Sequence, residues 1–378
     1  MLFYVTFANR YVRDECFMVK TAYMVSDVDE LYMHRCIQLA RCAVGSTSPN
    51  PMVGAVIVAD GRIIGEGYHV RAGEPHAEVN AIRSVKSADR HLFPNSTIYV
   101  TLEPCSHYGK TPPCCDLIIK EKIGRVVIGT TDNNQCVNGA GISRMQNAGI
   151  EVVVGVLPNE CAELNPPFFT YNSLGRPCVT LKWAQTADGY IDAVRKGDGA
   201  LRISTSVSQV AVHRLRSMHD AILVGTRTAL LDNPSLNLRH WAGRSPLRLV
   251  IDKDGVLPVA LKLFDGTLPT VVYTASPIVG KFGKNVEQVA IDFSKDILSQ
   301  ILSHLHGLKV NSLLVEGGAC LLQSFIDASL WDYARVEVNP ALFVGGGVVS
   351  PVVPEEYLLD VACCGGNRIL YYTKQKTT

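Results

Sequence analysis

The chain has 378 residues, 47% hydrophobic and 19% charged, which suits a globular protein large enough for two domains. Its 36 Lys and Arg against 35 Asp and Glu give a net charge of +1, so it has no global field to attract nucleic acid, though a local basic pocket for one phosphate is compatible. No apolar run is long enough to span a membrane, and no secretory signal is evident. We expect a cytoplasmic protein whose thiols are reduced, so we interpret clustered cysteines as metal ligands before disulfides.

Helices and strands alternate through the first part of the chain. Apolar residues at helical spacing predict helices over Asp27–Cys42, Ala77–Ser87, Cys115–Lys122 and Ile142–Ala148. Short β-branched runs predict strands at Val53–Ala59, Arg62–Gly67, Ser96–Leu102, Arg125–Thr130 and Glu151–Val156, the first two forming a hairpin. This alternation predicts a parallel or mixed sheet covered on both faces by helices.

A second alternating series follows a segment interrupted by proline and glycine. Its predicted strands are Val179–Lys182, Ala221–Val224, Leu247–Ile251, Thr270–Tyr273, Ser312–Val315, Tyr333–Val338 and Arg368–Tyr372. Its predicted helices are Ser206–Ser217 and Ala319–Ala328. We therefore divide the chain into an N-terminal extension (1–26), a first α/β domain (27–165), a linker (166–177) and a second α/β domain (178–373).

Candidate zinc ligands stand at the ends of predicted elements in the first domain. His76 and Glu78 open one helix, Cys105 follows a strand, and Cys114 opens the next helix. Three protein ligands leave one tetrahedral position of Zn²⁺ open for water, whose pKa the metal lowers to about 7. A carboxylate that is not a ligand, here Glu78, then carries protons to a leaving ammonia. This chemistry favours hydrolytic deamination, although Cys115 is an alternative to Cys114 as the third ligand.

The spacing of the cysteines departs from the general pattern of zinc deaminases. That pattern is His-x-Glu followed by Pro-Cys-x-x-Cys. Here eight residues separate Cys105 from Cys114, so a longer loop is available to reach over a substrate. A structural zinc site would usually have four protein ligands, whereas these motifs supply three.

Longer motifs go beyond a generic deaminase. The stretches Thr47–Gly54, Gly73–Glu78 and Thr101–Cys114 strongly resemble the bifunctional riboflavin-biosynthesis deaminase/reductase family. The resemblance implies an N-terminal three-layer α/β domain of the cytidine-deaminase type, acting on 2,5-diamino-6-ribosylamino-4(3H)-pyrimidinone 5′-phosphate. It also implies site residues: His76, Cys105 and Cys114 on zinc, Glu78 as proton carrier, Asn50 against the base and Lys110 on the nucleotide.

The second domain carries a weaker signal when it is taken alone. No Gly-x-Gly-x-x-Gly follows a predicted strand, so a Rossmann dinucleotide site is not supported. Leu313–Gly318 and the helix predicted after it have the pattern of a strand, a glycine turn and a helix start. The free amide groups at such a helix start can bind phosphates. An ordinary helix cap explains the same pattern equally well.

Four further segments, 182–189, 213–216, 220–225 and 232–239, are similar to the reductase half of the family. This similarity implies a dihydrofolate-reductase-like α/β fold that uses NADPH to reduce a ribosyl chain to ribityl. The implied NADPH-binding residues are Gln185, Arg202, Thr228, Asp232, Lys253 and Gly318. The implied substrate-binding residues are Lys182, Arg216, Leu236, Arg239 and Glu316.

Two positions depart from the family. Arg202 replaces a tryptophan that would pack on the cofactor, and Lys253 replaces a small polar residue. A deaminase with an inactive reductase-like domain is therefore one alternative. An RNA-acting deaminase, or a nucleic-acid binder with structural zinc, is another, which the near-zero net charge disfavours. We expect a homo-oligomer that acts on a small pyrimidine nucleotide and binds neither nucleic acid nor membrane.

Overall fold

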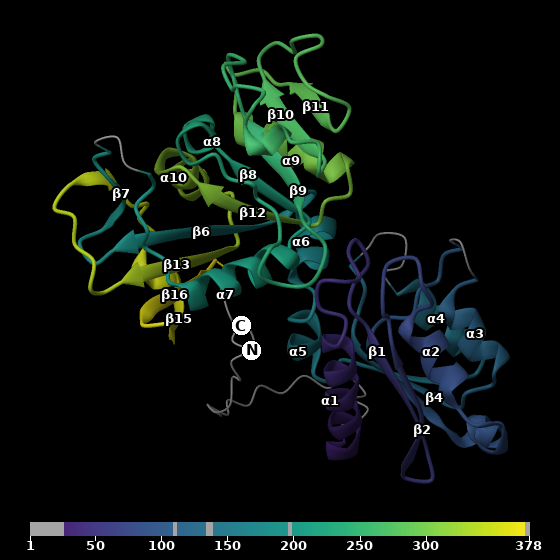
Figure 1. The fold of residues 1–378 in the computed structure, drawn as a ribbon. Helices are drawn as coiled ribbons and strands as arrows, with labels where there is room; N and C mark the ends of the chain where they lie inside the picture. Colours follow the sequence, from purple (N-terminus) through teal and green to yellow (C-terminus); the bar gives the residue numbers. More distant parts are fainter. Residues whose placement is uncertain (1–25, 109–111, 134–138, 196–198, 375–378) are drawn as a thin grey trace.

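The structure, a computed structural model, describes residues 26–108, 112–133, 139–195, 199–374. The chain forms two α/β units, each built on its own large sheet (Figure 1). None of the described helices has the length and apolar character to cross a bilayer. The predicted N-terminal extension lies outside the described residues except for Ser26, whose side chain caps the first helix.

The first unit is a mixed sheet with the strand order β2-β1-β3-β4-β5. Its strands are β1 (Gly54–Ala59), β2 (Arg62–Tyr68), β3 (Thr97–Leu102), β4 (Arg125–Thr130) and β5 (Glu151–Val154). Its helices are α1 (Asp27–Arg41), α2 (Ala77–Ser84), α3 (Cys114–Lys120), α4 (Ala140–Asn147) and α5 (Pro158–Ala162), with a 3-10 helix η1 (Ser87–Asn95). The hairpin pairs β1 with β2, β1 is antiparallel to β3, and β3, β4 and β5 run parallel. The predicted elements of this unit are confirmed, with ends shifted by a few residues.

Alternation along the strands gives this sheet a separate core on each face. On β1, Ala55 and Ile57 pack with α2, α3 and α4, whereas Val56 and Val58 pack with α1 and α5. Side chains of successive strand residues point to opposite faces, so a strand buried on both sides is apolar throughout. The prediction of helices on both faces is confirmed.

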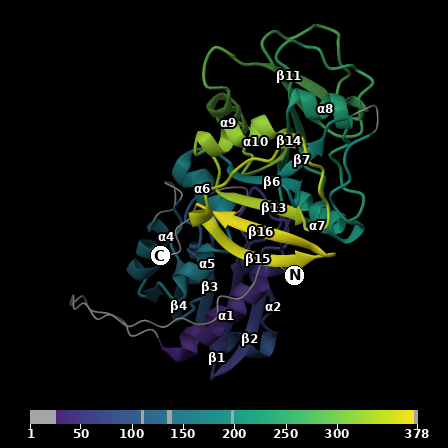
Figure 2. The same ribbon diagram turned by 90° about the vertical axis from the view of Figure 1, so that its left-hand side faces the viewer.

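The segment predicted as a linker is a helix, α6 (Pro166–Leu174), which lies between the two units (Figures 1 and 2). Pro166 and Pro167 occupy its first turn, where a missing N–H costs nothing, and Gly175 ends it in the left-handed region. Proline and glycine here delimit a helix and do not produce an irregular connection. The domain boundaries at residues 165 and 178 stay a prediction.

The second unit contains a sheet ordered β11-β10-β9-β8-β12-β6-β13-β16-β15 and a small β14-β7 pair. The strands are β6 (Cys178–Thr186), β7 (Tyr190–Ala193), β8 (Ala221–Val224), β9 (Leu247–Ile251), β10 (Thr270–Thr274), β11 (Val286–Ala290), β12 (Ser312–Gly317), β13 (Tyr333–Asn339), β14 (Gly347–Val349), β15 (Leu358–Cys364) and β16 (Asn367–Thr373). The helices are α7 (Ser206–Ser217), α8 (Thr226–Asp232), α9 (Ile297–Gly307) and α10 (Ala319–Asp327), with 3-10 helices η2 (Lys262–Phe264) and η3 (Glu355–Tyr357). In this order, all strands from β11 at one edge through β13 run parallel to their neighbours. Strands β16 and β15 are antiparallel and form the other edge, seen in Figure 2.

Helices α9 and α10 pack on one face of this sheet, and α7 and α8 on the other. The predicted strands and the helices α7 and α10 are confirmed. The prediction missed α9, although its sequence carries the signal for a helix. Asp296 caps the backbone of its first turn, and Leu298, Ile301, Leu302 and Leu305 bury one face at helical spacing.

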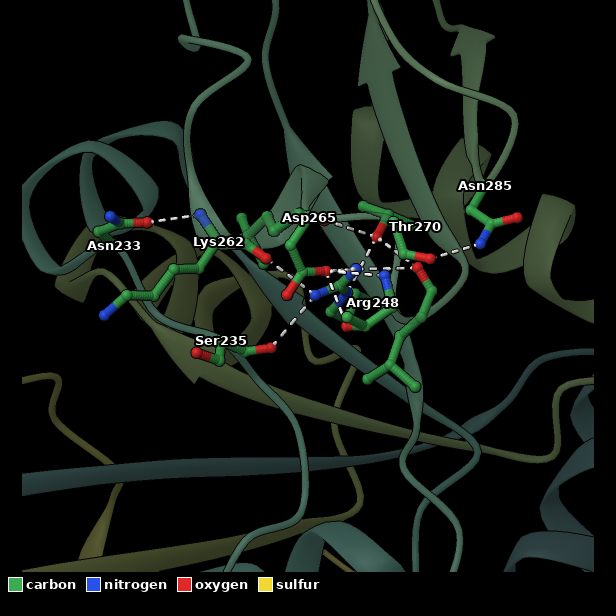
Figure 3. A network of polar contacts seen from close by, with 11 residues as sticks. Asn233, Ser235, Arg248, Lys262, Asp265, Thr270 and Asn285 are labelled. Carbon is green, nitrogen blue, oxygen red and sulfur yellow. Dashed lines mark hydrogen bonds and ion pairs between the residues drawn. The ribbon is translucent and has the colours of Figure 1, made fainter.

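A buried arginine on β9 anchors the loops at the amino-terminal end of that strand (Figure 3). Arg248 is 0% exposed, and its guanidinium donates to Thr270 Oγ1 at 2.9 Å and to the carbonyls of Lys262 at 3.0 Å and Leu268 at 2.8 Å. It also pairs with the Asp265 carboxylate at 3.1 Å. A buried charge is tolerated only when it is paired and hydrogen-bonded in this way.

We expect Arg248→Met to lower the free energy of unfolding by about 2–4 kcal/mol, because it leaves Asp265 and several buried acceptors without their donor. Urea denaturation measures this change. The control is Arg244→Met, which removes an ion pair to Asp220 from an arginine whose side chain is 70% exposed. That control should cost less than about 1 kcal/mol, and equal losses in the two variants would contradict the anchoring role of Arg248.

Candidate active sites

Three metal-binding side chains meet at the ends of separate elements in the first unit. His76 is the N-cap of α2, Cys105 follows β3, and Cys114 is the first residue of α3. The imidazole Nδ1 of His76 lies 3.6 Å from Cys105 Sγ and 3.4 Å from Cys114 Sγ. Their ligand atoms all lie within 4.8 Å of one another.

Hydrogen bonding makes this cluster ready for a cation. The Cys105 sulfur accepts from the Cys114 thiol and from its backbone N–H at 3.3 Å, and it faces the His76 ring. These contacts lower the pKa of Cys105 to about 4, while donation to Cys105 raises the pKa of Cys114. Cys105 in turn raises the pKa of His76 to about 9. One nitrogen and two sulfurs in this arrangement are a donor set that suits zinc.

The neighbouring cysteine takes no part in the cluster. Cys115 is fully buried and packs with the apolar core between α3 and the sheet. Its sulfur donates to Asp116 Oδ1 at 3.6 Å, and burial raises its pKa to about 11. Between the two candidates for the third ligand, Cys114 is therefore the one brought to His76 and Cys105.

Glu78 lies on the first turn of α2 beside the three ligands. It is only 3% exposed, and burial together with the nearby Cys105 raises the pKa of its carboxyl to about 7. A carboxyl group with a pKa near neutrality can both take and give a proton at physiological pH. This is the property that an acid–base residue at a hydrolytic site requires.

Asn50 reaches the same pocket from the loop before β1, where a histidine absent from the sequence-based set holds it. The Asn50 amide lies 3.1 Å from His69 Nε2, and His69 Nδ1 lies 3.1 Å from the carbonyl of Pro75. Burial lowers the pKa of His69, which favours a neutral ring that accepts from Asn50. The sequence contained no motif around His69 that would distinguish it from a core histidine.

Glu103 is a second pocket residue that the sequence analysis did not identify. It is 3% exposed and accepts N–H groups from Gly139 at 3.0 Å and Gly141 at 3.2 Å, at the start of α4. A carboxylate at a helix N-terminus satisfies free amides and complements the helix dipole. The position of Glu103 within the Thr101–Cys114 motif was the feature of the sequence that could have identified it.

A pocket of about 340 Å³ is lined by six of these residues, Asn50, His69, His76, Glu78, Glu103 and Cys105. The first unit alone does not enclose it, because the pocket is also lined by Phe168, Tyr171 and Asn172 of α6 and by Lys309 and Asn311 of the second unit. Lys110, the residue implied to contact the nucleotide, lies outside the described residues.

The second unit holds a cluster of buried charges at the carboxyl ends of its central strands. Arg216 on α7 donates to both carboxylate oxygens of Glu316 on β12, at 2.8 and 2.7 Å. Burial acts to raise the pKa of Glu316, but the charges of Arg216 and Lys182 outweigh it and lower that pKa to about 2. Burial lowers the pKa of Lys182, on the adjacent β6. The predicted substrate residues Lys182, Arg216 and Glu316 thus lie together.

Two helix N-termini stand side by side next to this cluster. Gly225 caps α8 after β8, and Gly318 caps α10 after β12, the neighbouring strand. A Cβ on Gly317 would lie 2.8 Å from the Thr228 side chain, so only glycine lets the turn approach α8 this closely. The free amides at two neighbouring helix starts are groups of the kind that bind phosphates.

The remaining residues implied to bind NADPH differ in their exposure to solvent. Gln185 accepts from the indole of Trp183 at 2.8 Å, and Asp232 pairs with Arg195. Arg202 and Lys253 are exposed, with the Lys253 ammonium 5.9 Å from the centre of the Phe293 ring.

Two predicted substrate residues share one loop after α8. The side chain of Leu236 is 2% exposed and packs in the core, so only its backbone is available to a ligand. Arg239 is exposed and donates to Asn237 Oδ1 at 2.6 Å. Arg239 is therefore accessible to a phosphate, whereas the buried Leu236 side chain packs the loop against the core.

Fold and sites define a two-domain protein with a zinc-deaminase-type first unit and a second α/β unit. Residues 26–130 match the family described as the cytidine and deoxycytidylate deaminase zinc-binding region, and residues 177–363 match the RibD C-terminal domain. The chain is 39% identical over 326 residues to the riboflavin biosynthesis protein RibD of Aquifex aeolicus, covering 85% of this chain and 90% of that protein. It is 36% identical to RibD of Escherichia coli, covering 83% and 88%.

Solved structures agree with these relatives. The diaminohydroxyphosphoribosylaminopyrimidine deaminase/5-amino-6-(5-phosphoribosylamino)uracil reductase of Thermotoga maritima superposes with a TM-score of 0.82 at 37% identity, covering 92% of this chain and 98% of that one. RibD of Acinetobacter baumannii gives a TM-score of 0.83 at 32% identity, with the same coverage. The chain belongs to the RibD family of riboflavin biosynthesis proteins.

The electrostatics of the second unit predict how its stability varies with pH. His213 Nδ1 accepts the backbone N–H of Arg239 at 3.1 Å, and burial, with the charges of Arg216 and Arg239, lowers its pKa to about 4. An unfolded histidine titrates near 6.5, so the unfolded chain takes up the proton first as the pH falls. This group's contribution is therefore fully present above pH 6.5 and is lost as the pH falls toward 4.

We expect the wild type to lose about 1–2 kcal/mol more than His213→Gln between pH 7 and pH 4.5, because glutamine accepts the same N–H without titrating. Urea denaturation at the two pH values measures the difference. His91→Gln, on the exposed face of η1, is the control and should follow the wild type. A His213→Gln profile that also parallels the wild type would show that the His213 ring does not titrate on unfolding.

Proposed function

We propose that the chain is a bifunctional enzyme of riboflavin biosynthesis. The first unit would deaminate 2,5-diamino-6-ribosylamino-4(3H)-pyrimidinone 5′-phosphate with zinc, and the second would reduce the ribosyl chain of the product to ribityl with NADPH. The observation that carries the proposal is the convergence of His76, Cys105 and Cys114 next to the buried acid Glu78. Membership of the RibD family supports both activities.

In the deaminase unit, His76, Cys105 and Cys114 would hold the metal. Zinc, when bound with three protein ligands, supplies Lewis acidity that activates water for attack on the ring carbon bearing the amino group. Glu78 would accept a proton from that water and deliver it to the departing ammonia. Asn50, oriented by His69, would donate to the base and fix which ring carbon faces Glu78.

We expect Glu78→Gln to retain zinc but to lower the rate of ammonia release by at least about 10²-fold, because the amide cannot carry a proton. Ammonia assays with the diaminopyrimidine nucleotide and elemental analysis of the same preparations measure the two quantities. Glu160→Gln, on the exposed surface of α5, is the matched control and should behave as the wild type. Substantial ammonia release by Glu78→Gln would remove Glu78 from this role.

In the reductase unit, the adjoining N-termini of α8 and α10 would bind the phosphates of the cofactor. NADPH, when bound, supplies the hydride. Lys182 has an ammonium whose pKa is lowered by burial, so its Nζ would hold and deliver the accompanying proton. The Arg216–Glu316 pair would fix the position of Lys182 and keep water from the site.

We expect purified protein to oxidise NADPH when the deaminated nucleotide is added, and Lys182→Met to slow this reaction by about 10²-fold. Loss of the nicotinamide absorbance measures the rate. Lys295→Met is the control, because that lysine is exposed and its ion pair is with the exposed Asp292. A wild type that releases ammonia yet consumes no NADPH would leave a deaminase with an inactive reductase unit.

A further inference from the structure

The pocket around the proposed zinc ligands is completed by the other domain. Strand β12 and the turn that follows α9 belong to the second unit, yet Lys309 and Asn311 of this connection line the pocket that contains His76 and Glu78. Residues separated by more than 200 positions in the sequence therefore line one cavity. The wall formed by Lys309 and Asn311 is not part of the proposed deaminase chemistry, so it calls for a separate explanation.

The contacts at the end of α9 hold this wall in place. The carbonyl of His306 accepts two hydrogen bonds, from the Tyr171 hydroxyl at 2.8 Å and from the Lys309 backbone N–H at 2.9 Å. The rings of Tyr171 and His306 stack with their centroids 4.2 Å apart. Helix α6, through Tyr171, and the backbone of Lys309 thus both donate to the carbonyl of His306.

Asn311 makes a second link, directly to the loop that carries Asn50. Its side-chain amide donates to the carbonyl of Pro49 at 2.7 Å, and its backbone N–H donates to the Asp220 carboxylate at 3.0 Å. Asn311 is 5% exposed, so the link is shielded from water. The second domain therefore sets the position of the residue before Asn50.

Lys309 itself adopts a backbone conformation that glycine would favour. Its φ is 59°, in the left-handed region, at the turn that ends α9. A side chain there is strained, and glycine is the usual residue at this point of a helix end. Glycine at this position would therefore remove the ammonium without straining the backbone.

The charged residues that line the pocket indicate a role for the Lys309 side chain. Among the described residues that line the pocket, Lys309 is the only lysine or arginine, whereas Glu78, Glu103 and Asp132 are acidic. Within the described part of the chain, the Lys309 ammonium is exposed and forms no hydrogen bond or ion pair. A cation of this kind would attract a dianionic phosphate that enters beside three carboxyl groups.

We propose that Lys309 binds the 5′-phosphate of the nucleotide whose base is deaminated, and that Asn311 positions the Pro49–Asn50 loop. The deaminase site is then composite, with the base held by the first domain and the phosphate by the second. This inference rests on the proposed function. It differs from the role implied for Lys110, which would place the phosphate contact within the first domain.

The test uses Lys309→Gly, which removes the ammonium and suits the left-handed backbone. We expect the melting temperature to stay equal or to rise, while KM for the diaminopyrimidine nucleotide rises roughly tenfold or more and kcat stays within about twofold. With the dephosphorylated nucleoside, the variant and the wild type should have the same kcat/KM for ammonia release. Lys309→Arg should retain most of the affinity for the nucleotide.

The matched control is Lys122→Gly. Lys122 is also an exposed lysine with a φ of 59° after a helix, here α3, and it does not line the pocket. It should gain the same thermal stability with no change in KM. An unchanged KM in Lys309→Gly, or an equal loss with nucleotide and nucleoside, would overturn the phosphate role while leaving the deaminase intact. A wild type that releases no ammonia from the nucleotide would instead overturn the proposed function, and this inference with it.

Discussion

The hydrogen bonds around Cys105 are the interactions on which the first site depends. Donation from the Cys114 thiol, the amide at the start of α3 and the His76 ring stabilise a thiolate on Cys105 inside the protein. A cation bound here would be held by two sulfurs and one nitrogen that already lie within 4.8 Å of one another. The same burial that isolates the cluster raises the pKa of Glu78 to about 7. Hydrogen bonding thus prepares Cys105 to bind a metal, whereas burial prepares Glu78 for acid–base catalysis.

The two domains are joined by polar contacts that also shape the deaminase pocket. The Tyr171 hydroxyl on α6 donates to the carbonyl of His306 on α9. The side-chain amide of Asn311, just before β12, donates to the carbonyl of Pro49 in the first unit. Separate domains connected by a flexible linker would not fix these groups. Fusion of the two units therefore has a structural consequence for the first site, in addition to placing two successive activities on one chain.

The second site depends on charges buried with their partners. Glu316 stays ionised because Arg216 binds both its oxygens, and Lys182 stands beside them on β6. Arg248 plays a similar part at the opposite end of the sheet, where it ties together loops that would otherwise leave carbonyls unsatisfied. Removing Arg216 would leave the buried Glu316 carboxylate without its partner, and removing Arg248 would leave buried carbonyls without a donor.

The sequence by itself determined the two alternating α/β series and the residue types at the zinc cluster. Periodicity is local, and motifs such as His76-Ala77-Glu78 keep their chemistry in any fold that brings them together. Tertiary structure decided between Cys114 and Cys115, because adjacent helical residues point in different directions and only one faces His76. It also brought in His69, Glu103 and Lys309, whose roles come from contacts with residues remote in sequence. No local pattern encodes such contacts, because they form only when separate elements pack.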